Sequence, residues 1–69
     1  MKEFEYPEVT IITVNFNGKR FLSDLFLSIK NLNYPGRLVE TIMVDNGSKD
    51  GSVAAIRNSY PLCLMAYGY

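Results

Sequence analysis

TIITVNFNG at residues 10–18 has the same form as TIMVDNGS at residues 41–48: each is an apolar run that ends in a polar loop containing glycine. A segment with a helical pattern separates the two runs. In an open parallel α/β sheet, ligands bind outside the carboxyl ends of the strands. The two polar loops are therefore predicted to lie at one site, and the loops rather than the strands are expected to carry the function.

Three segments have the composition of strands. Residues 9–14 are rich in Ile, Val and Thr and almost continuously hydrophobic, which suits a strand covered on both faces by helices. Residues 38–44 form the second predicted strand. Residues 62–69 are apolar and short enough for a third, although an irregular packed tail has the same composition.

Two helices are predicted between these strands. Apolar side chains recur at helical spacing from Lys19 to Leu32, and a shorter helix is predicted from Gly51 to Ser59, with Ser48 and Asp50 as candidate N-caps. The order β-α-β-α-β favours right-handed crossovers. We therefore expect an α/β fold, a Rossmann-like unit with a three-stranded parallel sheet.

Composition excludes several classes of function. Seven basic and seven acidic residues are scattered over 69 positions, so the chain lacks the basic stripe that nucleic acid binding requires. One cysteine, Cys63, excludes an internal disulfide and is expected to be a small buried hydrophobe; the absence of histidine removes the commonest metal ligand and general base. Acidic residues near the amino terminus and the lack of a membrane-spanning apolar run indicate a cytoplasmic protein.

The loop after the first strand is not a known phosphate-binding loop. Asn15-Phe16-Asn17-Gly18 has one glycine, whereas the dinucleotide fingerprint needs three, and no Walker sequence occurs. Asp45 at the end of the second strand is the carboxylate that remains. Because an ionised carboxylate only accepts hydrogen bonds, it suits an N–H or O–H donor such as the imide of uracil or a ribose hydroxyl.

These segments together resemble the start of a family-2 glycosyltransferase with the GT-A fold. The resemblance rests on VTIITVNFNG at residues 9–18, NYP at residues 33–35 and VDNGSKDGS at residues 44–52, in that order and at fitting separations. It implies transfer of a sugar from a nucleotide-activated donor to an acceptor glycan of unknown identity. The amino-terminal half of such a fold holds the nucleotide.

The resemblance also implies roles for individual residues. Val14 would contact the base through main-chain groups, and Asp45 would hydrogen-bond the uracil or thymine ring. Asn15 and Asn17 lie in the loop that approaches the nucleotide. Asn46 stands where the family often has a second aspartate, so hydrogen bonding is retained and the charge is lost. These details are similar to the rhamnosyltransferase branch and favour a UDP- or dTDP-sugar.

Other parts of the family pattern do not occur in the chain. The resemblance implies a divalent metal, Mg or Mn, held by an Asp-x-Asp motif, and no such motif occurs in the sequence. The acceptor-side carboxylate that would act as general base is also missing. Since both groups assist the reaction, the isolated chain is expected to be inactive.

The resemblance divides the chain into residues 1–8 as an amino-terminal tail, residues 9–61 as the matching segment and residues 62–69 as a divergent third strand or tail. Truncation of the sheet would leave the first strand as an apolar edge, which predicts homo-oligomers. Two other classes stay open. One is an α/β enzyme that binds adenine nucleotides or flavin, and the other is a non-catalytic interaction module.

Overall fold

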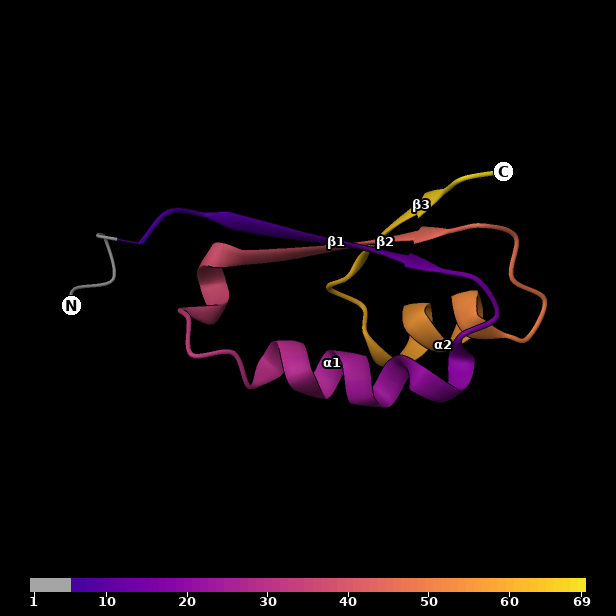
Figure 1. The fold of residues 1–69 in the computed structure, drawn as a ribbon, viewed down its shortest axis with the longest axis horizontal. Coiled ribbons are helices and arrows are strands. Elements are labelled where there is room, and N and C mark those ends of the chain that lie inside the picture. Colours follow the sequence, from indigo (N-terminus) through magenta and orange to yellow (C-terminus); the bar gives the residue numbers. More distant parts are fainter. Residues whose placement is uncertain (1–5) are drawn as a thin grey trace.

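The computed structural model describes residues 6–69, and in them strands and helices alternate as the sequence predicts (Figure 1). The five amino-terminal residues, which include most of the predicted tail, lie outside the described part. Short 3-10 helices precede α1 and β2. The elements are β1 (Val9–Asn15), η2 (Lys19–Phe21), α1 (Leu22–Lys30), η3 (Gly36–Leu38), β2 (Val39–Asp45), α2 (Ser52–Ser59) and β3 (Leu64–Tyr67).

The sheet has three parallel strands in the order β1-β2-β3, which confirms the predicted fold class. Val9 pairs with Val39 at one end of β1, and Asn15 pairs with Asp45 at the other. Since β1 and β2 end at the same level, the polar loops that follow them start side by side. The third predicted strand is present, and Tyr67 at its end pairs with Asp45.

Both helices cover the same face of the sheet (Figure 1). Side chains that alternate along β1 show this: Ile12 and Val14, on the other face, are 65% and 63% exposed. Two right-handed crossovers that move the chain in the same direction across a sheet must place their helices on the same side. The prediction that β1 is covered on both faces is therefore wrong for the described part of the chain.

A small core lies between the sheet and the helices. Among the described residues, its three buried hydrophobic side chains are Leu22 of α1, Met43 of β2 and Ile56 of α2. Phe26 and Tyr60 stack against this core with ring centroids 3.9 Å apart. Cys63 also packs there, half-buried.

The first helix is shorter than the sequence pattern predicts, whereas α2 lies within one residue of its predicted bounds. The α-helical part of the first is Leu22–Lys30, because the chain enters it through η2, in which the Phe21 amide bonds the Gly18 carbonyl. As a result Phe21 and Leu32, which belong to the apolar helical pattern of the sequence, lie outside α1 and are 58% and 48% exposed. At α2 the N-cap is Gly51, which has no side-chain cap, rather than Ser48 or Asp50 as predicted. Asp50 lies one residue earlier and accepts the Ser52 amide hydrogen at 3.0 Å.

Candidate functional site

The loops after β1 and β2 meet in a polar cluster, which we define as Asn15, Asn17, Asp45 and Ser48. The Asn15 amide nitrogen donates to Asp45 Oδ1 at 2.9 Å and to Ser48 Oγ at 3.0 Å, and its Oδ1 accepts from the Gly18 amide. Asn15 is 6% exposed. Its carboxamide thus joins segments about thirty residues apart, so it positions the loops from inside the fold.

Asp45 is fully buried, and both of its carboxylate oxygens are engaged. Oδ1 accepts from Asn15 and from the Ser48 hydroxyl at 2.7 Å, and Oδ2 accepts from the Gly47 and Ser48 amides at 3.1 and 2.9 Å. Burial raises the pKa of Asp45, but the hydrogen bonds from Asn15, Ser48 and Gly47 outweigh burial and the net pKa lies below its ordinary value. The carboxylate is therefore ionised at neutral pH and shapes its own loop.

Gly47 makes this loop possible. Its φ of +91° lies in the region that residues with a Cβ rarely adopt. With the chain turned there, the amides of residues 47 and 48 both point to the carboxylate of Asp45. The sequence Asp-Asn-Gly-Ser thus forms a turn in which an aspartate bonds its own backbone.

Ser48 is the member of the polar cluster that the sequence analysis placed elsewhere, as a candidate helix N-cap. Its hydroxyl accepts hydrogen bonds from the Asn15 amide group and the Asn17 backbone amide, and donates one to Asp45. A hydroxyl has one donor and two acceptor positions, so all are used. The spacing Asp-x-x-Ser was the available signal, since it is common in turns.

A second set of contacts ties the loops together nearer the surface. Asn17 adopts the left-handed conformation, with φ +53°, and its Oδ1 accepts from the Lys49 amide at 2.8 Å. The Lys19 amide donates to Asp50 Oδ2 at 2.9 Å. Among residues 6–69, no buried side-chain nitrogen or oxygen lacks a hydrogen-bond partner. The two loops therefore form one cross-linked unit.

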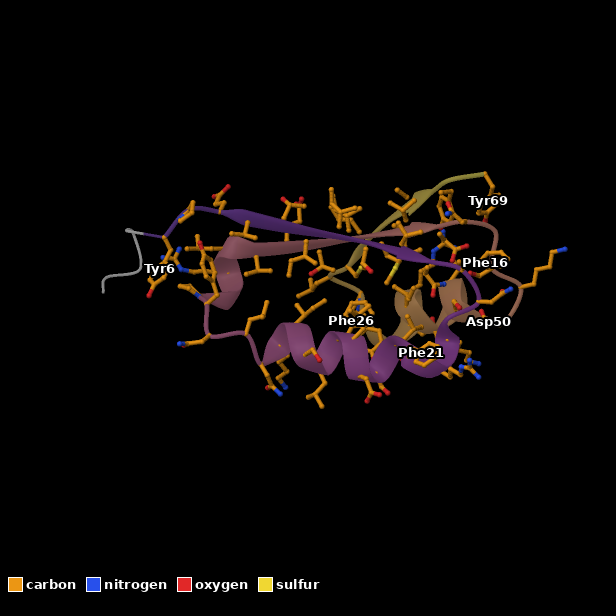
Figure 2. All side chains as sticks on the ribbon, in the orientation of Figure 1. Tyr6, Phe16, Phe21, Phe26, Asp50 and Tyr69 are labelled. Carbon is orange, nitrogen blue, oxygen red and sulfur yellow. The ribbon has the colours of Figure 1, made fainter. Side chains whose placement is uncertain are left out.

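Beside the cluster, several side chains remain free to meet a ligand. Asn46 is exposed, although its backbone amide bonds the Asn15 carbonyl. Phe16 and Tyr69 are 64% and 76% exposed, and Figure 2 places both at this end of the molecule. The Val14 side chain points to the open face of the sheet. The structure thus brings Asn15, Asp45 and Asn17 together and leaves Asn46 and Phe16 accessible next to them.

The site does not have the ligand set of a metal ion. In the part of the chain that the structure describes, no group of three His, Cys, Asp or Glu side chains could hold a metal. Asp45 and Asp50 are both occupied by donors from the protein itself. Residues 6–69 also contain no helix long and apolar enough to cross a membrane.

Fold and loops together define a Rossmann-like unit of the GT-A type whose polar loops meet at the carboxyl ends of its strands. The sequence profile of glycosyl transferase family 2 matches residues 10–64, and the chain belongs to this family. No curated protein matches the chain.

One similar solved structure is the mannosyltransferase PcManGT from Pyrobaculum calidifontis, in complex with GDP-Man and Mn2+. It is 26% identical, with a TM-score of 0.72 over 88% of this chain. The chain spans 19% of the length of that mannosyltransferase. The predicted family and fold are thus confirmed.

Proposed function

We propose that this chain is the nucleotide-binding part of a glycosyltransferase that uses a nucleotide-activated sugar. The observation that carries the proposal is the meeting of two polar loops at the carboxyl ends of β1 and β2, in a chain that belongs to glycosyl transferase family 2. Ligands of open parallel sheets bind at such a position. The similar mannosyltransferase was solved with a nucleotide sugar, GDP-Man, which supports this class of ligand.

Within this proposal, Asp45 does not contact the nucleotide; it holds the loop that does. A carboxylate has about four acceptor positions, and Asp45 already accepts four hydrogen bonds from Asn15, Ser48 and Gly47. Direct bonding to a base would require the loss of one of them. Asn46, the exposed neighbour of Asp45, then faces the base instead, together with the main chain at Val14.

Asn17 and Phe16 complete the proposed nucleotide contacts. Asn17 holds the loop that borders the nucleotide, and Asn15 fixes this loop against Asp45. The exposed Phe16 ring offers a face on which a base can stack, a contact that contributes about 1–3 kcal/mol per base. Stacking tolerates any base, so the hydrogen bonds of Asn46 would fix the orientation of the stacked base.

Two classes of nucleotide-sugar substrate are supported by different observations. The resemblance of the loops favours UDP- or dTDP-sugars, and the similarity to PcManGT favours GDP-sugars. A carboxamide offers both donors and an acceptor, so Asn46 can bond the edge of uracil, thymine or guanine. We take the pyrimidine nucleotides as the first candidates and guanine nucleotides as the second.

Titration of the chain with UDP, dTDP and GDP, followed by amide NMR shifts, tests the proposal. We expect saturable shifts at Val14, Asn17 and Asn46 with at least one of these nucleotides. Phe16→Ala should weaken binding about tenfold, because a stacking contact of more than 1 kcal/mol is lost. Asn46→Ala should weaken it by about five- to tenfold, because hydrogen bonds to the base are lost.

The matched control for this titration is Asn33→Ala, an exposed asparagine between α1 and β2. It should leave the affinity unchanged. A well-folded chain whose spectrum responds to none of the three nucleotides would contradict the proposal. A response to ADP or flavin alone would favour a different α/β enzyme.

We propose that catalysis needs parts of a glycosyltransferase that this chain does not contain. A divalent metal, as in the Mn2+ complex of PcManGT, assists such transfer in our proposal, yet residues 6–69 contain no group of ligands for it. No acceptor-side base is assigned either. Sugar transfer above background by the purified chain would contradict this part of the proposal.

Self-association is the second candidate function, and the position of β1 favours it. In the described part of the chain β1 is an edge strand, and its side chain Ile12 is 65% exposed. Unpaired apolar edges bind further strands. We expect concentration-dependent dimers in sedimentation velocity experiments.

Ile12→Lys should raise the dimer dissociation constant at least tenfold, since lysine on an edge opposes pairing. The control Leu32→Lys changes an exposed leucine outside the sheet and should have little effect. A chain that stays monomeric at every accessible concentration would rule this candidate out.

A further inference from the structure

A second concave site lies on the helix side of the sheet, toward the amino-terminal end of β2. It is an open groove of about 530 Å³ between α1, the start of β2 and the turn that joins α2 to β3. None of its lining residues belongs to the polar cluster. A volume in this range is typical of sites for small molecules, which are mostly apolar with few polar groups.

The walls of the groove are apolar and partly solvent-exposed. Phe26 and Tyr60, the stacked pair of rings, belong to its lining, together with two leucines, Leu27 of α1 and Leu62 of the turn. Leu27 is 57% exposed and Leu62 is 92% exposed. Two leucines that line a groove and leave this much apolar surface in water provide a surface that an apolar chain would cover.

In residues 6–69, the charged lining of the groove is positive only. Lys30 is the one charged residue among the described residues that line it, and the polar groups that remain are hydroxyls and the Cys63 thiol. Burial raises the pKa of the Cys63 thiol, so this group is neutral. Lys30 would therefore attract a ligand with an anionic head group and repel one with a cationic head group.

We propose that this groove binds a medium-chain amphiphile with an anionic head, such as an alkyl carboxylate. The alkyl chain lies between Leu27 and Leu62 along the Phe26–Tyr60 pair, and the carboxylate is directed to Lys30. The proposal concerns a site apart from the nucleotide loops and does not depend on their function.

The open face of the sheet is the competing site for apolar ligands. It presents Ile12 and Val14 to solvent, but it contacts a ligand from one side only. A groove with walls buries more of an alkyl chain than a single surface does, and binding follows the area removed from water. The groove is therefore the favoured site.

Titration of the full chain with decanoate, below the concentration at which it forms micelles, tests the proposal by amide NMR shifts. We expect saturable shifts at Thr41, Tyr60 and Cys63. Leu62→Ser should weaken decanoate binding about tenfold, and because Leu62 is almost fully exposed this variant should fold normally. Shortening the ligand to octanoate should weaken binding by a similar factor.

Lys30→Gln separates the role of charge from that of apolar contact. It should weaken decanoate binding two- to fivefold, as expected for an exposed ion pair, and leave decanol binding unchanged. The matched controls are Leu32→Ser and Lys49→Gln, exposed residues outside the groove, which should change neither affinity. The proposal is overturned if the shifts fall on Ile12 and Ile42 of the open face, or if Leu62→Ser binds decanoate as tightly as the unchanged chain.

Discussion

Asp45→Ala is expected to lower the free energy of unfolding by about 3–5 kcal/mol, which would unfold much of a domain this small. The variant removes the acceptor of four hydrogen bonds, whose donors are the Asn15 amide group, the Ser48 hydroxyl and the backbone amides of Gly47 and Ser48. Since Asp45 is fully buried, these donors have little access to replacement water. Urea unfolding followed by circular dichroism would measure the loss.

The pH dependence of stability provides a second measurement of the same residue. The folded-state pKa of Asp45 lies below its ordinary value, so its contribution is present above the unfolded-state pKa of about 4 and is lost as pH falls through the folded-state pKa. Stability should therefore fall on acidification below about pH 5. Asp45→Asn should make the free energy of unfolding depend less on pH in this range. It should not abolish the dependence, because hydrogen bonds from Ser52 and Lys19 also lower the pKa of Asp50.

The matched control is Asp24→Asn, which changes an exposed aspartate of α1. It should alter the free energy of unfolding by less than about 0.5 kcal/mol, as surface substitutions usually do. If Asp45→Ala lowered the free energy of unfolding no more than this control, the polar cluster would not hold the loops. The positioning role that we propose for Asp45 would then be wrong.

Ile56→Ala is expected to lower the free energy of unfolding by about 3 kcal/mol, within the 2–5 kcal/mol found for such truncations. Ile56 is fully buried and is one of the buried hydrophobic side chains that form the core with Leu22 and Met43. The substitution would leave a cavity between α2 and the sheet. Among the described residues of α2, no other large apolar side chain is buried and could fill it. Thermal and urea unfolding would measure the effect.

Ile12→Ala is the control for that substitution, since it removes the same atoms from a side chain that is 65% exposed. We expect a loss of less than about 1 kcal/mol, because little surface returns to water. Equal losses for the two variants would mean that the open face of the sheet is covered in solution, for instance in an oligomer.

The sequence predicted those features that depend on local patterns. Strands, helices and the parallel order follow from apolar periodicity, and the meeting of the loops after Val14 and Val44 follows from the parallel order itself. The face to which the helices pack could not be read in this way. Ile12 and Val14 are as apolar as the inward-facing Ile11, so the pattern indicates two faces that could be covered, whereas the structure covers one.

The interior of the site was less predictable, because it depends on contacts between distant residues. Ser48 was expected to cap a helix, yet it bonds Asn15 and Asn17, more than thirty residues away in the chain. The burial of Asp45 was not predicted, because it follows from the turn at Gly47, whose conformation depends on the surrounding fold. Asn15 and Asn17 were both expected in the loop, yet Asn15 is the last residue of β1 and only Asn17 lies beyond the strand.

The cross-linked loops have a consequence for the thermodynamics of recognition. Ordering a flexible loop around a ligand costs conformational entropy, about 1–2 kcal/mol for each backbone residue that becomes fixed. Here Asn17, Ser48 and Asp50 fix both loops while the protein folds. A ligand that meets these loops encounters a preorganised surface, so little of its binding free energy is lost in ordering the chain.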